Sequence, residues 1–221
     1  MKPLAVGILA GLLAAAPGLA HDGAPAPRPT GPAPATGRAG AATCPDAAQA
    51  ARIAEAYGGA MAPMPFVAAA KLGLPEVVVA GGLPARLGHG VDGKAFAAVW
   101  ESLAAWPDAV VMIRKGANIF EIHTRVPTGK ASTRSKFFNL DHDVALSGHL
   151  RPDLVTAIQS VEMPGEEGFV RGVFFYDESG ESLLGVFVPP AEKPPAAQVA
   201  AFEKTRSLLR SLPARCPRPA A

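Results

Sequence analysis

The stretch from residue 109 to residue 188 constrains the fold of this chain more than any other part of the sequence. It is the only long region that is rich in β-branched and aromatic residues and poor in proline. Short apolar runs within it are separated by turns that contain glycine, proline and aspartate, a pattern typical of hairpin-connected strands. The region therefore predicts an antiparallel β-sheet.

The apolar runs give the expected strands. Residues 109–114 are continuously apolar, as in a buried strand, whereas residues 118–126 alternate with period two. That alternation places Glu121, His123 and Arg125 on one face of the strand. Further strands are expected at residues 136–140, 144–149, 157–163, 169–177 and 181–188.

Helical sequence patterns precede and follow this region. Helices are expected at residues 46–57, 65–72, 76–79, 94–106 and 196–212, the first of them capped by Asp46. Residues 80–93 contain five glycines and are expected to form a loop. The order of elements predicts an α+β domain: short N-terminal helices, a meandering antiparallel split-barrel-like β-sheet, and a C-terminal helix.

Residues 1–20 have the pattern of a secretory signal peptide. Lys2 precedes an apolar run, and the small residues Gly18 and Ala20 suit cleavage before His21. The apolar run is too short to span a bilayer comfortably, so an uncleaved anchor is the less favoured alternative. We expect a periplasmic or secreted protein with no membrane span after cleavage.

Residues 21–43 are dominated by alanine, proline, glycine and threonine and predict a disordered tether, which leaves residues 44–216 as a single folded domain. Cys44 and Cys216 stand at the two ends of that domain. An even pair in an exported chain predicts a disulfide. A metal or redox pair is the alternative, but neither cysteine belongs to a CxxC motif.

Several function classes are disfavoured by the sequence. The formal net charge is +2, and the two short helices within residues 65–79 carry no basic stripe, so we expect no nucleic-acid partner. The motifs GxSxG, HExxH, Walker A and GxGxxG are absent. The histidines are then the main candidates for chemistry.

His149 is the most prominent of the five histidines. Gly148 places it at an expected strand end, and Arg151 follows, so the imidazole can ligate a metal while a cation remains for an acidic ligand. His123 shares a strand face with a glutamate and an arginine, and a hydrogen-bonded surface role is its alternative. The remaining histidines are His21 in the tether, His89 in a glycine-rich loop and His142 in an Asp-His-Asp turn.

The segment from about residue 108 to residue 188 resembles haem-utilisation proteins of the HemS/ChuX/HutX type. The resemblance is carried, in order, by PTG at 127–129, FFNL at 137–140, SGHLRPD at 147–153, GVFF at 172–175 and ESG at 178–180. Residues 51–54 and 72–76 resemble that family's N-terminal helices more weakly. The similarity covers one family unit rather than the doubled form.

The resemblance implies a domain that binds haem b and serves haem trafficking or iron acquisition, and that forms a homodimer. It implies that His149, in the SGHL motif, is an iron ligand. The family's other histidine ligand falls at Arg114, which could instead hold a propionate or a ligand water, while His123 is the candidate replacement. The expected propionate partners, unless they form only a solvated basic loop, are Arg125, Lys130, Arg134 and Lys136.

Two further features depart from the family pattern. Val188-Pro189-Pro190 replaces the usual Gly-Arg after the last strand, and typical members are cytoplasmic and lack a signal peptide. The sequence thus predicts an exported haem carrier. Two alternatives stay open: a haem-degrading enzyme, for which the sequence offers no distinct acid, base or redox residue, and a haem-free interaction module, which Arg114 favours.

Overall fold

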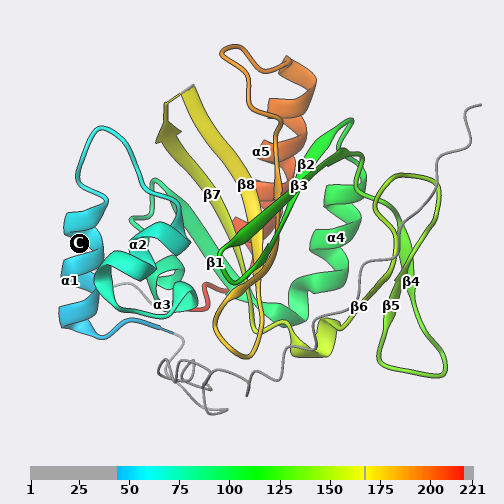
Figure 1. The fold of residues 1–221 in the computed structure, drawn as a ribbon, viewed down its shortest axis with the longest axis horizontal. Coiled ribbons are helices and arrows are strands. Elements are labelled where there is room, and N and C mark those ends of the chain that lie inside the picture. Colours follow the sequence, from blue (N-terminus) through cyan, green and yellow to red (C-terminus); the bar gives the residue numbers. More distant parts are fainter. Residues whose placement is uncertain (1–43, 167, 217–221) are drawn as a thin grey trace, which may run out of the picture. The chain divides into compact units, whose positions relative to one another are not determined.

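Two antiparallel β-sheets form the framework of the protein in the computed structural model (Figure 1). The structure describes residues 44–166 and 168–216, so the expected signal peptide (1–20) and tether (21–43) lie outside the described residues. The larger sheet has the strand order β1-β7-β8-β9-β2-β3, and the smaller has the order β4-β5-β6. The strands are β1 (Gly88–Asp92), β2 (Ala109–Lys115), β3 (Asn118–Thr124), β4 (Gly129–Ala131), β5 (Phe138–Leu140), β6 (His149–Leu150), β7 (Ala157–Gly165), β8 (Gly168–Tyr176) and β9 (Ser182–Phe187).

Helices precede, interrupt and close the sheets. They are α1 (Ala47–Ala56), α2 (Pro65–Leu72), α3 (Glu76–Gly81), α4 (Phe96–Ala104) and α5 (Ala196–Ser211), with 3₁₀ turns η1 (Gly93–Ala95) and η2 (Pro152–Leu154). Asp46 caps α1 as expected, because its carboxylate accepts the backbone N–H of Gln49 at 2.8 Å. The α+β class and the order of elements are confirmed, and the described strands form no closed barrel.

Both faces of the six-stranded sheet are buried over most of its strands, each by a different set of elements, whereas edge strand β3 is largely exposed. Helices α1–α3 cover one face, and helices α4 and α5 together with the small sheet cover the other (Figure 1). Successive side chains of a strand point to opposite faces. On β2, Val110 and Met112 therefore join the core under α1–α3, whereas Val111 and Ile113 face the core under α4 and α5.

Buried polar contacts fix α4 and α5 in place. The indole N–H of Trp100 on α4 donates to the carbonyl of Pro127 at 2.9 Å, just before strand β4. The indole N–H of Trp106 donates to Oγ1 of Thr205 on α5, also at 2.9 Å. The first of these bonds holds the chain that enters the small sheet against α4, so the position of the small sheet depends on Trp100.

The expected loop at residues 80–93 is wrong. The segment ends helix α3 and then forms strand β1, which pairs with the long strand β7. A Cβ atom at Gly88 or Gly90 would collide with the side-chain amide of Gln159 on β7. The glycines thus permit a close approach inside a sheet, whereas their composition alone indicates a turn.

Two other boundaries differ from expectation. Residues 144–148 do not extend into a strand, and β6 comprises only His149 and Leu150. Gly148 has φ +142°, which only glycine adopts readily, and the chain bends there. The predicted helix at 94–106 begins with the 3₁₀ turn and ends two residues early.

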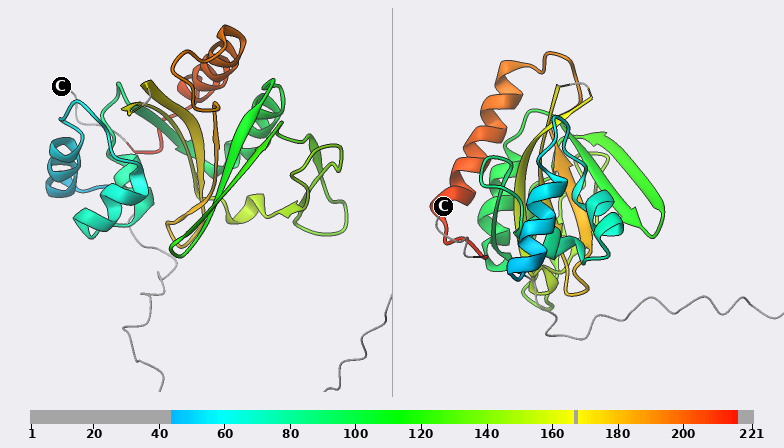
Figure 2. Two further views of the ribbon diagram at one scale, coloured as in Figure 1. Left: turned by 45° about the horizontal axis from the view of Figure 1, so that its top comes forward. Right: turned by 90° about the vertical axis from the view of Figure 1, so that its left-hand side faces the viewer.

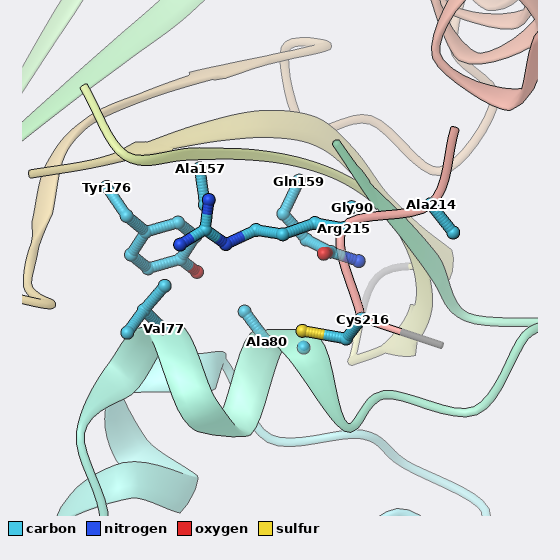
Figure 3. Close-up of a pocket in the computed structure, with 10 residues that line it drawn as sticks. Val77, Ala80, Gly90, Ala157, Gln159, Tyr176, Ala214, Arg215 and Cys216 are labelled. Carbon is cyan, nitrogen blue, oxygen red and sulfur yellow. The ribbon is translucent and has the colours of Figure 1, made fainter. Parts of the chain in front are cut away.

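The disulfide between Cys44 and Cys216 is confirmed, and it joins the two ends of the described chain. Residues 214–216 lie across α3 and β1, beside a cavity of about 10 Å³ (Figure 3). The Arg215 N–H donates to the Gly90 carbonyl at 2.9 Å. Burial raises the pKa of Tyr176, whose hydroxyl adjoins this cavity, so the phenol stays neutral. The cavity has room for no more than about one water.

In the described part of the chain, none of the helices has both the length and the apolar character that crossing a bilayer requires.

We predict that the disulfide contributes much of the stability, because it closes a loop with a sequence separation of 172. On the chain-entropy model, a C44S/C216S variant should lose roughly 5 kcal/mol of unfolding free energy. Urea denaturation would measure this, with reduced wild-type protein as the matched control. Equal midpoints for the oxidised wild type and the variant would contradict the prediction.

Candidate functional site

The small sheet places three polar side chains in one row on its outer face. Strand pairing sets Lys130 of β4 opposite Asn139 of β5, and Asn139 opposite His149 of β6. The neighbouring residues Phe138 and Leu150 point to the other face, where they pack against the core under α4. The exposed row is therefore Lys130, Asn139 and His149.

The imidazole of His149 is held by one hydrogen bond. Its Nδ1 lies 2.8 Å from Oδ1 of Asn139, and an amide oxygen only accepts, so Nδ1 carries the hydrogen. This leaves Nε2 with the free lone pair on an exposed ring. The Phe137 ring, which is 40% exposed, lies beside the imidazole with 5.8 Å between ring centroids. An imidazole oriented in this way can coordinate a metal ion. The neighbouring phenyl ring suits a metal that is carried by a flat, apolar molecule.

Several cations surround this row, and some already have carboxylate partners. Arg151 makes two hydrogen bonds to Asp153, at 2.7 and 2.8 Å, and Lys136 lies 3.4 Å from the same carboxylate. The bond from Arg151, with a smaller contribution from Lys136, lowers the pKa of Asp153 to about 2. Among the described residues, Lys130 and Arg134 make no ion pair. These two cations are the ones with charge to offer an acidic ligand.

Arg125 is placed more loosely. Its guanidinium lies 3.5 Å from the carboxylate of Asp143, and both side chains are more than half exposed. An exposed pair of this kind contributes little to stability. Arg125 can therefore change partners at little cost to stability.

Arg114 lies on the other face of the six-stranded sheet, under helices α2 and α3. Its guanidinium bonds to the carboxylate of Glu76, and it stacks over the ring of Phe66 with 4.1 Å to the centroid. Glu76 also accepts the backbone N–H of Ser182 at 3.1 Å. Arg114 thus ties the helices to the sheet, and within one chain it does not share a site with His149.

His123 lies on the same face of the large sheet as Arg114, away from His149. It lines a pocket of about 230 Å³ between β2, β3, β9 and the β7–β8 hairpin. Glu121 and Glu166 also line it, and its apolar lining includes Met64, Met112 and Phe187. Two carboxylates and no lysine or arginine line this pocket, which disfavours the propionates of haem there.

The structure therefore separates the candidate residues into two groups. His149 and Lys130 share the outer face of the small sheet, with Arg134 in the loop that joins β4 and β5. Arg114 and His123 lie across the large sheet. In the described residues no three histidine, cysteine or acidic side chains gather as a metal site.

Sequence reasoning missed the roles of Asn139 and Phe137 beside His149. Both belong to the FFNL motif, and pairing of that motif with residues 149–150 would have placed Asn139 opposite the histidine. No strand pairing was predicted for this region, so the contact was not foreseen.

The sequence of this chain matches one protein family. The model of haem-utilisation ChuX/HutX proteins matches residues 90–205, which is more than half of the 221 residues. The chain belongs to the ChuX/HutX haem-utilisation family. No match was found among curated proteins.

Solved structures of ChuX/HutX relatives share this fold. The heme-binding protein ChuX is 23% identical, with a TM-score of 0.58 over 65% of this chain and 90% of ChuX. Haem-loaded PhuS, a heme-binding protein from Pseudomonas aeruginosa, is 19% identical, with a TM-score of 0.56 over 75% of this chain and 46% of PhuS. The E. coli heme oxygenase ChuS is 15% identical, with a TM-score of 0.52 over 65% of this chain and 43% of ChuS. The present chain thus matches about half of each of the two longer proteins.

We predict that neutral His149 is the Nδ1–H tautomer, because Oδ1 of Asn139 can only accept. Long-range ¹H–¹⁵N spectra of histidine-labelled protein at alkaline pH would read the tautomer directly. An N139A variant should shift His149 toward the Nε2–H form, while His142, which is exposed nearby, serves as the internal control. A wild-type His149 protonated on Nε2 would refute the assignment.

Proposed function

We propose that this protein binds haem b on the outer face of the small sheet, with His149 as an axial ligand. Membership of a haem-utilisation family supports haem as the ligand. The hydrogen bond between His149 and Asn139 supports the choice of this site for haem. It occupies Nδ1 and orients the ring, so the lone pair of Nε2 is left for the iron. Partners of this kind fix ring orientation in metal-ligating histidines.

The surroundings of His149 fit the other parts of a haem. The exposed Phe137 ring offers an apolar contact for the porphyrin. Lys130, in the same row, and Arg134, in the adjoining loop, make no ion pair with any described residue and suit the two propionates. Arg151 and Lys136 both pair with Asp153, so either would have to leave that carboxylate to bind a propionate. When bound, haem supplies an iron that accepts the imidazole as a ligand.

We propose that the protein acts as a carrier rather than as a haem-degrading enzyme. The relative ChuS is a heme oxygenase, so degradation is the competing function. The amide of Asn139 and the ring of Phe137, which contact His149, transfer neither protons nor electrons. Release of iron and an open tetrapyrrole in the presence of an electron donor would favour the enzyme instead.

We also propose that the protein is exported to the periplasm or the medium and that it forms a homodimer. Export is supported by the signal-like pattern of residues 1–20 and by the disulfide, which persists in oxidising compartments. A homodimer would allow His123 of one copy to approach a haem on His149 of another, because the two histidines lie on opposite sides of the large sheet within one chain. Exposed Ile119 and Phe120 on edge strand β3 are consistent with such an interface.

We predict that haemin titrated into the protein gives a saturable, shifted Soret band near one haem per chain or per dimer. The variant H149A should lose this band, or bind at least about tenfold more weakly, because the ligand nitrogen is gone. H142A is the matched control, since it removes an exposed histidine from the same region and should bind as the wild type does.

A wild-type spectrum that H149A leaves unchanged would sink the ligand assignment. Loss of the band in H123A but not in H149A would move the site to the pocket beside β3. The absence of any saturable band would favour a haem-free interaction module.

A further inference from the structure

A groove of about 960 Å³ lies between helix α4 and strand β4. The floor of this groove is aromatic, and its helix wall carries alanines together with the charged side chains of Lys94 and Glu101. The floor residues are Phe96, Trp100 and Phe138, and the alanines on the helix side are Ala97, Ala104 and Ala105. Strand β4 forms the opposite wall and is an edge strand of the small sheet. The groove therefore has a helix on one side and an open strand on the other.

Strand β4 presents unused backbone groups at its free edge. The carbonyl of Thr128 and the N–H of Ser132 bond to residues that flank β5, at 2.9 and 2.7 Å. Backbone groups alternate in direction along an antiparallel strand, so those of Gly129 and Ala131 point away from β5. In the part of the chain that the structure describes, no backbone bond from another element reaches these two residues.

We propose that this groove binds an extended segment of a partner protein, which pairs with β4 as a fourth strand of the small sheet. Outward N–H and C=O groups of an edge strand are a template for such pairing. In this mode the main-chain bonds give affinity, and pockets for alternate side chains give specificity. Helix α4 has nine residues, or about 14 Å, which matches about four residues of extended chain.

The walls of the groove define the chemistry of the segment. Side chains that point inward meet Phe138 and Trp100 beside the small alanines, so they should be aliphatic. Side chains on the outer face lie beside Lys130, which makes no ion pair among the described residues, so an acidic residue belongs there. The expected partner segment alternates aliphatic and acidic residues.

This docking needs no bound haem, but it shares Lys130 with the proposed haem site and lies beside that site. A strand added to β4 would lie three strand spacings from β6, or about 14 Å between backbones. Its outward side chains would continue the row of Lys130, Asn139 and His149. A partner that delivers or receives haem would then be held beside the ligand.

Phage display tests the proposal. Random heptapeptides would be selected against the intact protein, and the affinity of the selected sequences would be measured with synthetic peptides. A131P removes one outward N–H and should weaken binding by about tenfold or more, whereas A131S, which keeps the N–H, should not. A104W fills the groove and should abolish binding. The haemin titration of A131P should match the wild type, which separates this docking site from the haem site and reports that the small sheet is intact.

The proposal predicts enriched peptides that alternate aliphatic and acidic residues and that distinguish A131P from A131S. It is overturned if no sequence is enriched, or if the selected peptides bind A131P and A104W as they bind the wild type. It is also overturned if the protein alone is a dimer that A131P dissociates, because β4 would then pair with a second copy.

Discussion

The structure depends on burial of both faces of the six-stranded sheet. One face needs α1–α3 and the other needs α4, α5 and the small sheet, as the two views in Figure 2 show. Because side chains alternate along each strand, β2 sends Val111 to one core and Met112 to the other. The same alternation commits Arg114 and His123 to the side of the N-terminal helices and leaves the small sheet to carry His149.

The same division places Arg114 in a polar contact under the N-terminal helices, away from His149. Arg114 is satisfied by Glu76 and by the ring of Phe66, and Glu76 in turn accepts the N–H of Ser182. The guanidinium thereby links α2, α3 and β9. Removing one member of a largely buried ion pair leaves an uncompensated charge, so the pair constrains both residues together. On the other side of the sheet, a hydrogen bond to Asn139 orients His149.

Sequence patterns predicted the parts of this protein that follow from hydrophobic periodicity. The buried run at 109–114, the final hairpin around residues 178–180 and the closing helix are examples. The Cys44–Cys216 disulfide was predicted on a different ground, the presence of an even cysteine pair. Strand β1 was missed because its glycines serve contact with Gln159 rather than a turn. The separation of His149 from Arg114 was also beyond the sequence, since it depends on how the short strands β4–β6 pack against α4 and not on local propensity. The export signal and the haem ligands stay predictions.

Paramagnetic broadening tests the position of the ligand most directly. Ferric haemin would be added to ¹⁵N-labelled protein, with the diamagnetic zinc protoporphyrin as the control. The account predicts that amide signals of Lys130, Asn139 and His149 broaden selectively, whereas those around Met64, Met112 and His123 persist. Broadening of the second group with the first unaffected would contradict it, and would place haem in the pocket beside β3.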